Sequence, residues 1–312
     1  MPGPTSHTYF SQRLRLHYLD WGNAQAPPLL LIHGNRDHAH NWDWTAARLQ
    51  HRYHIIAPDL RGHGDSQWSR GSMYAPAEYV YDIAQLVHQQ RLAPLRIVAH
   101  SLGGLVALQY TGIFPELVER LAVIEGWASV LAARGRPRPP ERMRAWVETQ
   151  RSLAARRPRR YASMEDASQR MQEANPHLSP DQVRHLTIHG ANQNEDGTYT
   201  WKFDNYVHAG HAFDLPPEDV IELWHNITCP VLLITGAESW ARSWSDPQEL
   251  TDRFTDARYT VVEGAGHWVQ HDQLDRFVDL VDDFLMSPHT AASDTHVPGS
   301  PAQPPSIGED ER

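Results

Sequence analysis

LRIVAHSLGGLVALQY, residues 95–110, is the stretch of sequence that decides the fold of this chain. Its first residues form a short apolar run that predicts a buried strand, and its last residues have the character of a helix, so Ser101 stands at a sharp turn between the two. The small residues Ala99 and Gly103, two positions before and after the serine, let strand and helix approach closely. Such a turn exposes the hydroxyl in a strained backbone conformation, beside the free N–H groups of a helix N-terminus.

Strands and helices alternate on both sides of this turn. Helical spacing is found between the apolar runs, and the runs themselves predict strands at 14–21, 28–33, 53–57, 95–99, 120–125, 231–235 and 259–262. Continuous apolar strands are expected where helices cover both faces of a sheet. The pattern therefore predicts an α/β protein with a mostly parallel sheet and right-handed crossovers.

The alternation stops between Trp127 and Asn226, where helical stretches such as Arg142–Ala155 and Pro180–His189 are broken by prolines. Because no strand is predicted there and strands resume afterwards, we expect residues 128–225 to form an inserted helical cap. The core then comprises residues 1–127 and 226–286. Residues 287–312 contain almost nothing apolar to bury, which predicts a disordered tail.

Length and composition restrict the class of protein. A chain of 312 residues, with 40% hydrophobic and 21% charged residues, can form one large globular domain with an insertion. The net charge of −10 argues against nucleic acid as a partner, and the apolar runs are too short for a membrane span. The single Cys229 excludes an intrachain disulfide, and the N-terminus lacks the pattern of a signal peptide, so a cytoplasmic location is predicted.

Polar motifs follow the predicted strands in a fixed order. They are His33-Gly34-Asn35, the loop Asp59–Ser66, the Ser101 turn, Glu125 and Gly264-Ala265-Gly266-His267-Trp268. In this order, and at strand ends, they resemble the α/β-hydrolase family over residues 10–127 and 226–286. The resemblance implies an α/β-hydrolase fold, with an eight-stranded type of sheet flanked by helices.

The resemblance also implies roles for individual residues. Ser101 would be the nucleophile and His267 the base that takes its proton, in the chain order of the family. The backbone N–H groups of Leu102 and Asn35 would form the oxyanion hole, with Arg36 a weaker candidate as donor. Trp127 and Trp268 neighbour these residues and are expected to line an apolar acyl pocket.

The acid of the triad has several candidates. The family often carries an aspartate three residues after a glycine at the end of the penultimate strand, but here Ser239 holds that position after Gly236. Glu238 is one residue away, and Asp246 is more distant. Glu125 ends an apolar strand, where a carboxylate has little structural reason to be, and related hydrolases take their acid from that strand end. Glu125 is therefore favoured over Glu238, and both remain open.

The predicted function is cleavage of a carboxylic ester with a small to medium acyl chain, through an acyl-enzyme on Ser101 and without a cofactor. The same machinery serves hydrolysis of thioesters, lactones, amides or carbon–carbon bonds, and acyl transfer or perhydrolysis. A non-catalytic ligand-binding receptor on this fold is the alternative from another class. An aspartate nucleophile, as in haloalkane dehalogenases and epoxide hydrolases, is excluded by Ser101.

Two further patterns are predicted to be structural. Residues 134–160 contain ten arginines and two glutamates, and we interpret them as a solvated face of the cap, which could support a homodimer. Histidines recur in pairs, but no carboxylate or cysteine stands at a spacing typical of zinc sites, so no metal is predicted. The pairs are His38 with His40, His185 with His189, and His208 with His211.

Overall fold

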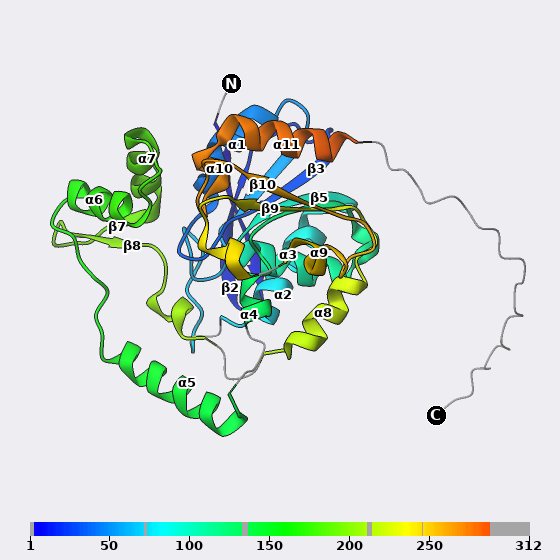
Figure 1. Cartoon of the computed structure of the whole chain (residues 1–312). Coiled ribbons are helices and arrows are strands. Elements are labelled where there is room, and N and C mark those ends of the chain that lie inside the picture. Colours follow the sequence, from blue (N-terminus) through cyan, green and yellow to red (C-terminus); the bar gives the residue numbers. More distant parts are fainter. Residues whose placement is uncertain (1–2, 72–73, 133–136, 211–213, 245, 288–312) are drawn as a thin grey trace, which may run out of the picture.

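The computed structural model describes residues 3–71, 74–132, 137–210, 214–244 and 246–287, so the tail predicted from residue 287 lies, except for Ser287, outside the described residues. An eight-stranded sheet in the order β1-β2-β4-β3-β5-β6-β9-β10 forms the centre (Figure 1). β1 and β2 are antiparallel, and all strands from β4 onward along the sheet are parallel, which confirms the predicted mostly parallel sheet. The strands are β1 Thr5–Ser11, β2 Leu14–Asp20, β3 Pro28–Ile32, β4 His54–Pro58, β5 Leu95–His100, β6 Val118–Ile124, β9 Val231–Gly236 and β10 Ala257–Val262.

Helices cover both faces of the sheet, and alternate residues of each central strand face opposite layers. Leu30 and Ile97 pack with the helices of one layer, whereas Leu31 and Val98 pack with those of the other. The first layer holds α2 (Pro76–Gln90), α3 (Leu102–Ile113) and α8 (Pro217–His225), and the second holds α1 (Asp43–Leu49) and α11 (Leu274–Met286). Short helices complete the core: α4 (Ala128–Ala132), α9 (Pro247–Thr251) and α10 (Val269–Asp272).

The segment between β6 and β9 contains the predicted helices and a feature that the sequence analysis missed. Besides α4 and α8, its helices are α5 (Pro139–Ala154), α6 (Met164–Ala174) and α7 (Pro180–Gly190). The prediction that it lacks strands is wrong, because β7 (Ala191–Gln193) and β8 (Tyr199–Trp201) pair in an antiparallel hairpin. Three-residue strands are too short to give a period-two pattern, so this hairpin had no clear signal in the sequence.

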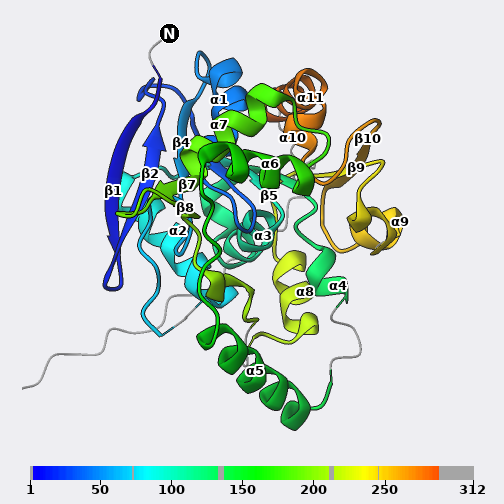
Figure 2. The same cartoon turned by 90° about the vertical axis from the view of Figure 1, so that its left-hand side faces the viewer.

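The two ends of this segment differ in how they pack. None of the described residues of α5 is buried, and the helix projects from the edge of the molecule in both views (Figure 2). By contrast, α8 packs against α3 and buries Trp224 in the core, although the predicted boundary at residue 225 assigns it to the cap. The inserted segment proper therefore runs through α5, α6, α7 and the β7–β8 hairpin. None of the helices described is both long and apolar enough to cross a membrane.

Candidate active site

Ser101 stands at the turn from β5 into α3, as its sequence context predicts. Its backbone has φ 51° and ψ −114°, a strained conformation for a residue with a side chain. The Ser101 N–H donates to the Ile124 carbonyl at 2.7 Å, which ties the turn to the end of β6. At Gly103 a Cβ atom would lie 2.5 Å from the carbonyl oxygens of Ile32 and His33, so only glycine lets α3 approach β3 this closely.

Glu125 and His267 are in direct contact at the carboxyl edge of the sheet. Glu125 follows β6 with a positive φ of 53° and is only 3% exposed, and its Oε2 accepts a hydrogen bond from Nδ1 of His267. Ser239 Oγ also donates to Oε2, at 2.7 Å, while Oε1 accepts from Thr235 Oγ1 at 2.7 Å and the Gly236 N–H at 3.0 Å. The carboxylate is thus fully satisfied, and with Nδ1–H donating to it, Nε2 of His267 is left as a proton acceptor.

The other two carboxylate candidates are elsewhere. The Glu238 side chain is 55% exposed and lies 3.7 Å from His177 Nε2. Asp246 caps α9, where it accepts from the N–H groups of Gln248 and Glu249. Ser239, at the position where the family often has aspartate, is instead a donor to Glu125. The sequence indicates no role for Ser239, and it does not single out Thr235, because a threonine at a strand end is an ordinary β-former.

Of the two predicted oxyanion donors, Leu102 follows Ser101 in the chain and Asn35 comes from another loop. Leu102 is the first residue of α3, so its N–H has no partner within the helix. Asn35 lies in the loop after β3 and lines the same cavity as Ser101. Its side-chain Oδ1 is 3.2 Å from His63 Nε2, which links this loop to the one after β4. His33 is structural: its Nε2 accepts from the Leu60 N–H at 2.9 Å, and its Nδ1 donates to the Gly34 carbonyl.

His100 is a neighbour that the sequence analysis did not single out. The ring is buried, its centroid is 4.6 Å from that of His267, and its Nε2–H donates to the His267 backbone carbonyl at 2.9 Å. Burial, followed by the proximity of His267, lowers the pKa of His100 well below its usual value, so the ring is neutral. His100 therefore holds the backbone of the His267 loop without adding a charge to the site.

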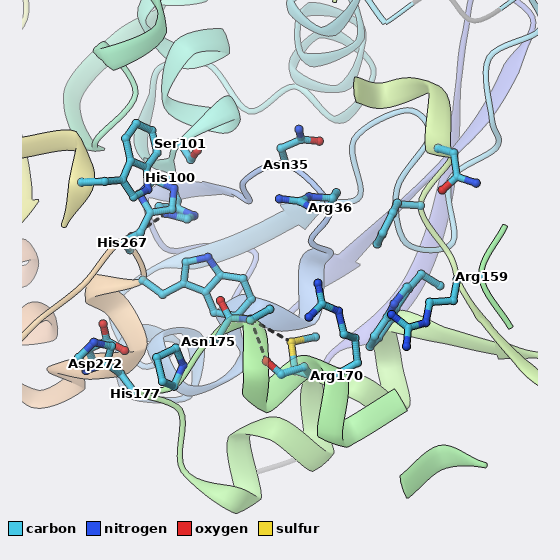
Figure 3. A pocket seen from close by; sticks show the side chains of 18 of the residues that line it. Asn35, Arg36, His100, Ser101, Arg159, Arg170, Asn175, His177, His267 and Asp272 are labelled. Atoms are coloured by element: carbon cyan, nitrogen blue, oxygen red, sulfur yellow. Dashed lines mark hydrogen bonds between the residues drawn. The ribbon is translucent and has the colours of Figure 1, made fainter. Parts of the chain in front are cut away.

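A cavity of about 720 Å³ opens between the edge of the sheet and the inserted segment (Figure 3). Ser101, His267 and Asn35 line it from the core side. Aromatic and apolar lining comes from Met171, Trp201, Phe203, Trp240 and Trp268. Trp268, one of the two tryptophans that the sequence places near the triad, is among these lining residues. The structure does not bring Trp127 to this cavity, because its side chain is buried in the core beside Tyr259, at 1% exposure.

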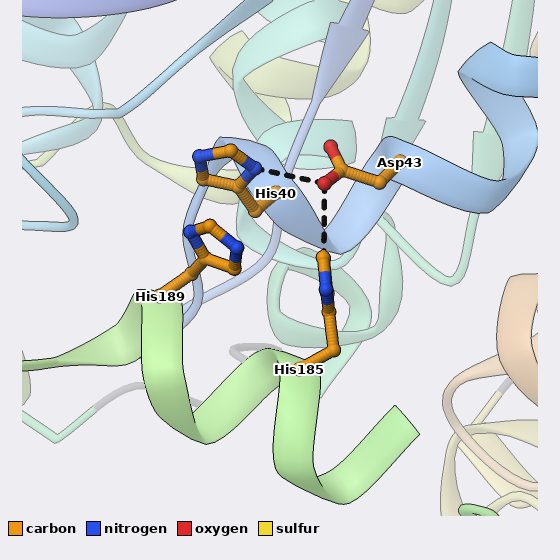
Figure 4. Close-up of side chains that lie close together, drawn as sticks. All are labelled: His40, Asp43, His185 and His189. Carbon is orange, nitrogen blue, oxygen red and sulfur yellow. Dashed lines mark hydrogen bonds and ion pairs between the residues drawn. The ribbon is translucent and has the colours of Figure 1, made fainter. Parts of the chain in front are cut away.

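Three of the histidines that occur in pairs along the sequence lie close together in the structure. His40, from the 3-10 turn η1 (Ala39–Trp42), meets His185 and His189 of α7, and Asp43 joins them (Figure 4). His38 borders this cluster: its ring centroid is 6.3 Å from that of His40, and its Nε2 is 3.0 Å from the Leu186 carbonyl oxygen. Of the third pair, the His208 side chain and His211 lie outside the described residues.

Comparison with known proteins agrees with this architecture. A profile of the alpha/beta hydrolase family matches residues 29–280, so the chain belongs to that family. It is 27% identical over 285 residues to the esterase Rv0045c of Mycobacterium tuberculosis, covering 89% of both chains. It is 29% identical over 269 residues to the sn-1-specific diacylglycerol lipase ABHD11 of Xenopus laevis, covering 85% of this chain and 82% of the lipase.

Solved structures show the same fold. The structure of the Rv0045c esterase superposes with a TM-score of 0.76 at 24% identity, over 92% of this chain and 93% of that one. A thioesterase domain from the curacin biosynthetic pathway superposes with a TM-score of 0.77 at 20% identity, over 90% and 99% of the two chains. The fold and the esterase and lipase relatives together support a hydrolase.

Proposed function

We propose that this protein is a serine esterase that acts through Ser101, His267 and Glu125. The observation that carries the proposal is the contact of Glu125 with His267, in a cavity that Ser101 also lines. A receptor without catalytic activity would not need a buried carboxylate that accepts four hydrogen bonds and orients one imidazole. The esterase and lipase among the relatives point to the same class of reaction.

In the proposed reaction, Ser101 Oγ attacks the carbonyl carbon of the ester while its proton passes to Nε2 of His267. The N–H groups of Leu102 and Asn35 stabilise the oxyanion, each contributing about 3 kcal/mol. The tetrahedral intermediate expels the alcohol, which takes the proton from His267. Water then repeats the sequence: His267 accepts a proton from it, the hydroxide attacks the acyl-enzyme, and the acid leaves as Ser101 regains its proton.

Glu125 has a supporting role in this sequence. Its carboxylate holds the Nδ1–H tautomer of His267 and stabilises the imidazolium that forms in each half-reaction. Ser239, Thr235 and Gly236 keep the carboxylate in place through their hydrogen bonds. The size of the cavity is compatible with small to medium acyl chains, which is the substrate range that we propose.

The test is the initial rate on p-nitrophenyl esters of increasing acyl length, for the wild type beside Ser101→Ala. We expect the substitution to lower kcat by about 10⁴-fold or more, because the nucleophile is removed. A fluorophosphonate probe that labels the wild type but not the variant identifies the same serine independently. Turnover that survives Ser101→Ala would contradict the proposal, and the profile of rate against chain length would measure the pocket.

A further inference from the structure

Three arginine side chains line the active-site cavity. Arg36 comes from the loop after β3, Arg159 from the stretch that precedes α6, and Arg170 from α6 itself. Figure 3 shows the three across the cavity from Ser101 and His267. Because they come from three separate parts of the chain, it is the tertiary structure that brings them to one cavity. They do not form a run of basic residues in the sequence.

These arginines have little negative charge to balance them. Arg36 makes no hydrogen bond or ion pair with another residue of the described ranges, and Arg159 lies over the ring of Tyr161, 5.2 Å from its centroid. Arg170 is 3.4 Å from Glu173, but both side chains are about half exposed, and such pairs contribute little. Burial, and then the nearby charge of Arg170, lower the pKa of Arg36.

The carboxylate among the described lining residues belongs to Asp272, and it is already engaged. Its Oδ2 accepts from the Gly266 N–H at 2.8 Å, on the His267 side of the cavity.

The arginine side of the cavity is therefore positive, and a guanidinium binds an oxyanion through paired N–H donors. We propose that the substrate is an ester that also carries an oxyanion group, a carboxylate or a phosphate, held by Arg36 and Arg170 with Arg159 beside them. This inference rests on the proposed esterase function.

The experiment compares two esters with acyl chains of equal length, 4-nitrophenyl butyrate and 4-nitrophenyl hemisuccinate, of which only the second is anionic. We expect wild-type kcat/KM to be at least about tenfold higher for the hemisuccinate, and Arg170→Gln to remove that preference by lowering kcat/KM for the hemisuccinate more than for the butyrate. Arg170→Lys keeps the charge but loses the paired donors, so it should recover part of the preference. Arg144→Gln, on the exposed face of α5, is the matched control.

A binding experiment with the free anions distinguishes a failure of this inference from a failure of the esterase proposal. Succinate and inorganic phosphate are titrated by calorimetry into Ser101→Ala protein, which needs no turnover. Binding that is lost in Ser101→Ala/Arg170→Gln supports the oxyanion site even if no ester is hydrolysed, and the preferred ion identifies the group. Butyrate hydrolysis without a preference for the hemisuccinate, together with no binding of either ion, would overturn the inference and leave the esterase intact.

The histidine cluster carries a second, independent inference. His40 Nδ1 and His185 Nε2 lie 2.8 and 2.9 Å from Oδ2 of Asp43, and the ring of His189 stacks on that of His40 with centroids 3.6 Å apart. One potential ligand atom from each of the four residues lies within 4.8 Å of the others. The expectation of no metal rests on the lack of a suitably spaced carboxylate, and Asp43, three residues after His40, supplies one.

The donors of this cluster are suited to a transition metal. Oδ1 of Asp43 is buried without a hydrogen-bond partner among the described residues, and His189 makes ring contacts without a hydrogen bond to any of them. Three imidazoles and one carboxylate form a ligand set that Zn²⁺ accepts in tetrahedral geometry.

We infer that His40, Asp43, His185 and His189 bind one divalent transition-metal ion, of which Zn²⁺ is the example. His40 and Asp43 belong to the core, whereas His185 and His189 belong to α7 of the inserted segment. A bound ion would therefore fasten α7 to the core next to the active-site cavity. The site is separate from the triad and does not depend on the proposed esterase function.

Zinc chloride is titrated by calorimetry into the chelator-treated full chain. We expect one ion per chain, with an affinity that falls by at least about tenfold in His189→Ala and in Asp43→Asn, while His88→Ala on α2 leaves it unchanged. Zn²⁺ should also raise the Tm of the wild type and not that of His189→Ala, because it binds the folded state only. Circular dichroism verifies that each variant is folded.

Cobalt gives a readout of geometry that an adventitious surface ion would not reproduce. A Co²⁺-loaded wild type should have the visible absorption of a tetrahedral site, and His185→Ala should lose it. Zn²⁺ binding that is equally tight in wild type, His189→Ala and Asp43→Asn would place the ion elsewhere and overturn the inference. The inference would also be overturned if the Co²⁺-loaded wild type had the tetrahedral absorption but Zn²⁺ bound wild type and His189→Ala with nearly the same affinity.

Discussion

The carboxyl edge of the sheet and the inserted segment face the same cavity, but they are built in different ways. At the edge, Glu125 is buried and its carboxylate accepts hydrogen bonds from four groups. In the inserted segment, α5 buries none of its described residues, and α6 buries only Ala167. The small apolar cluster of Leu178, Val183 and Leu186 packs against Trp44 and Trp268 of the core.

In the proposed function this difference corresponds to a division of roles: the sheet edge carries the reacting groups, and the inserted segment contributes groups that recognise the substrate. The groups that must be held to fractions of an ångström come from strand ends, where the rigid sheet fixes them. The groups that line the cavity from the other side, such as Arg159 and Arg170, come from helices and loops with little core of their own. A segment of this kind can change in sequence without disturbing the sheet, as is usual where specificity is placed on loops.

The largest expected effect on activity comes from substituting the two candidate acids of the triad, Glu125 and Glu238. Glu125→Gln should lower kcat by about 10³- to 10⁴-fold, because the amide cannot stabilise the imidazolium or fix the correct tautomer of His267. Glu238→Gln, which is one residue from the usual acid position but exposed, should stay within about twofold. Initial rates on a p-nitrophenyl ester measure both. A loss of activity in Glu238→Gln, with Glu125→Gln active, would reverse the assignment of the acid.

The next effect concerns pH at the contact between core and insert. His271 is buried beside Trp44 and Trp268, and the Gln182 side chain of α7 donates to its carbonyl. Burial, and then His38 and His185, lower the pKa of His271 to about 3. The unfolded chain, with a histidine pKa of about 6.5, therefore binds the proton more readily. Stability is complete above pH 6.5 and falls as the pH drops toward 3.

Urea denaturation at pH 7 and pH 5 measures this contribution. Between these values His271 alone should lower the free energy of unfolding by about 2 kcal/mol. His271→Leu should make the dependence on pH shallower by that amount, whereas the exposed His225→Leu should leave the slope unchanged. An unaltered slope in His271→Leu would mean that the ring is protonated in the folded protein.

Substituting one valine in each region by alanine compares how tightly the sheet and the inserted segment are packed. Val123 of β6 is fully buried, and its Cγ1 is so close to α3 that a Cβ on Gly104 would lie 2.8 Å from it. Val123→Ala should lower the free energy of unfolding by about 2 kcal/mol, from lost burial and the cavity left behind. Val147→Ala, on α5, should change it by less than about 0.5 kcal/mol. Equal losses would show that α5 packs against something in the folded protein.

The smallest effect concerns the serine that occupies the usual position of the acid. Ser239→Ala removes one of the hydrogen bonds to Glu125 and should lower kcat about tenfold, since the carboxylate keeps its other partners. Ser243→Ala, whose hydroxyl donates to the Trp240 carbonyl on the surface, should have no measurable effect. A Ser239→Ala enzyme as fast as the wild type would show that Thr235 and Gly236 hold Glu125 without it.

Several features could be predicted because they depend on local sequence. The turn at Ser101 needs small neighbours and a strand-to-helix junction, and both are visible in consecutive residues. The order of the buried strands is equally visible, as is the end of β6 at Glu125. The β7–β8 hairpin was missed because its strands are too short to show a period, and Ser239 was noted but not understood because its partner lies 114 residues away.

The sequence by itself determined the α/β class, the parallel sheet and the positions of Ser101 and His267, because these follow from apolar periodicity and from motifs of a few consecutive residues. Only the tertiary structure decided which carboxylate meets His267, that Trp127 turns into the core, and that Arg36 and Arg170 share a cavity. It also gathered His40, Asp43, His185 and His189. Such contacts join residues far apart in the chain, and their distances depend on how whole layers pack, which no local pattern encodes.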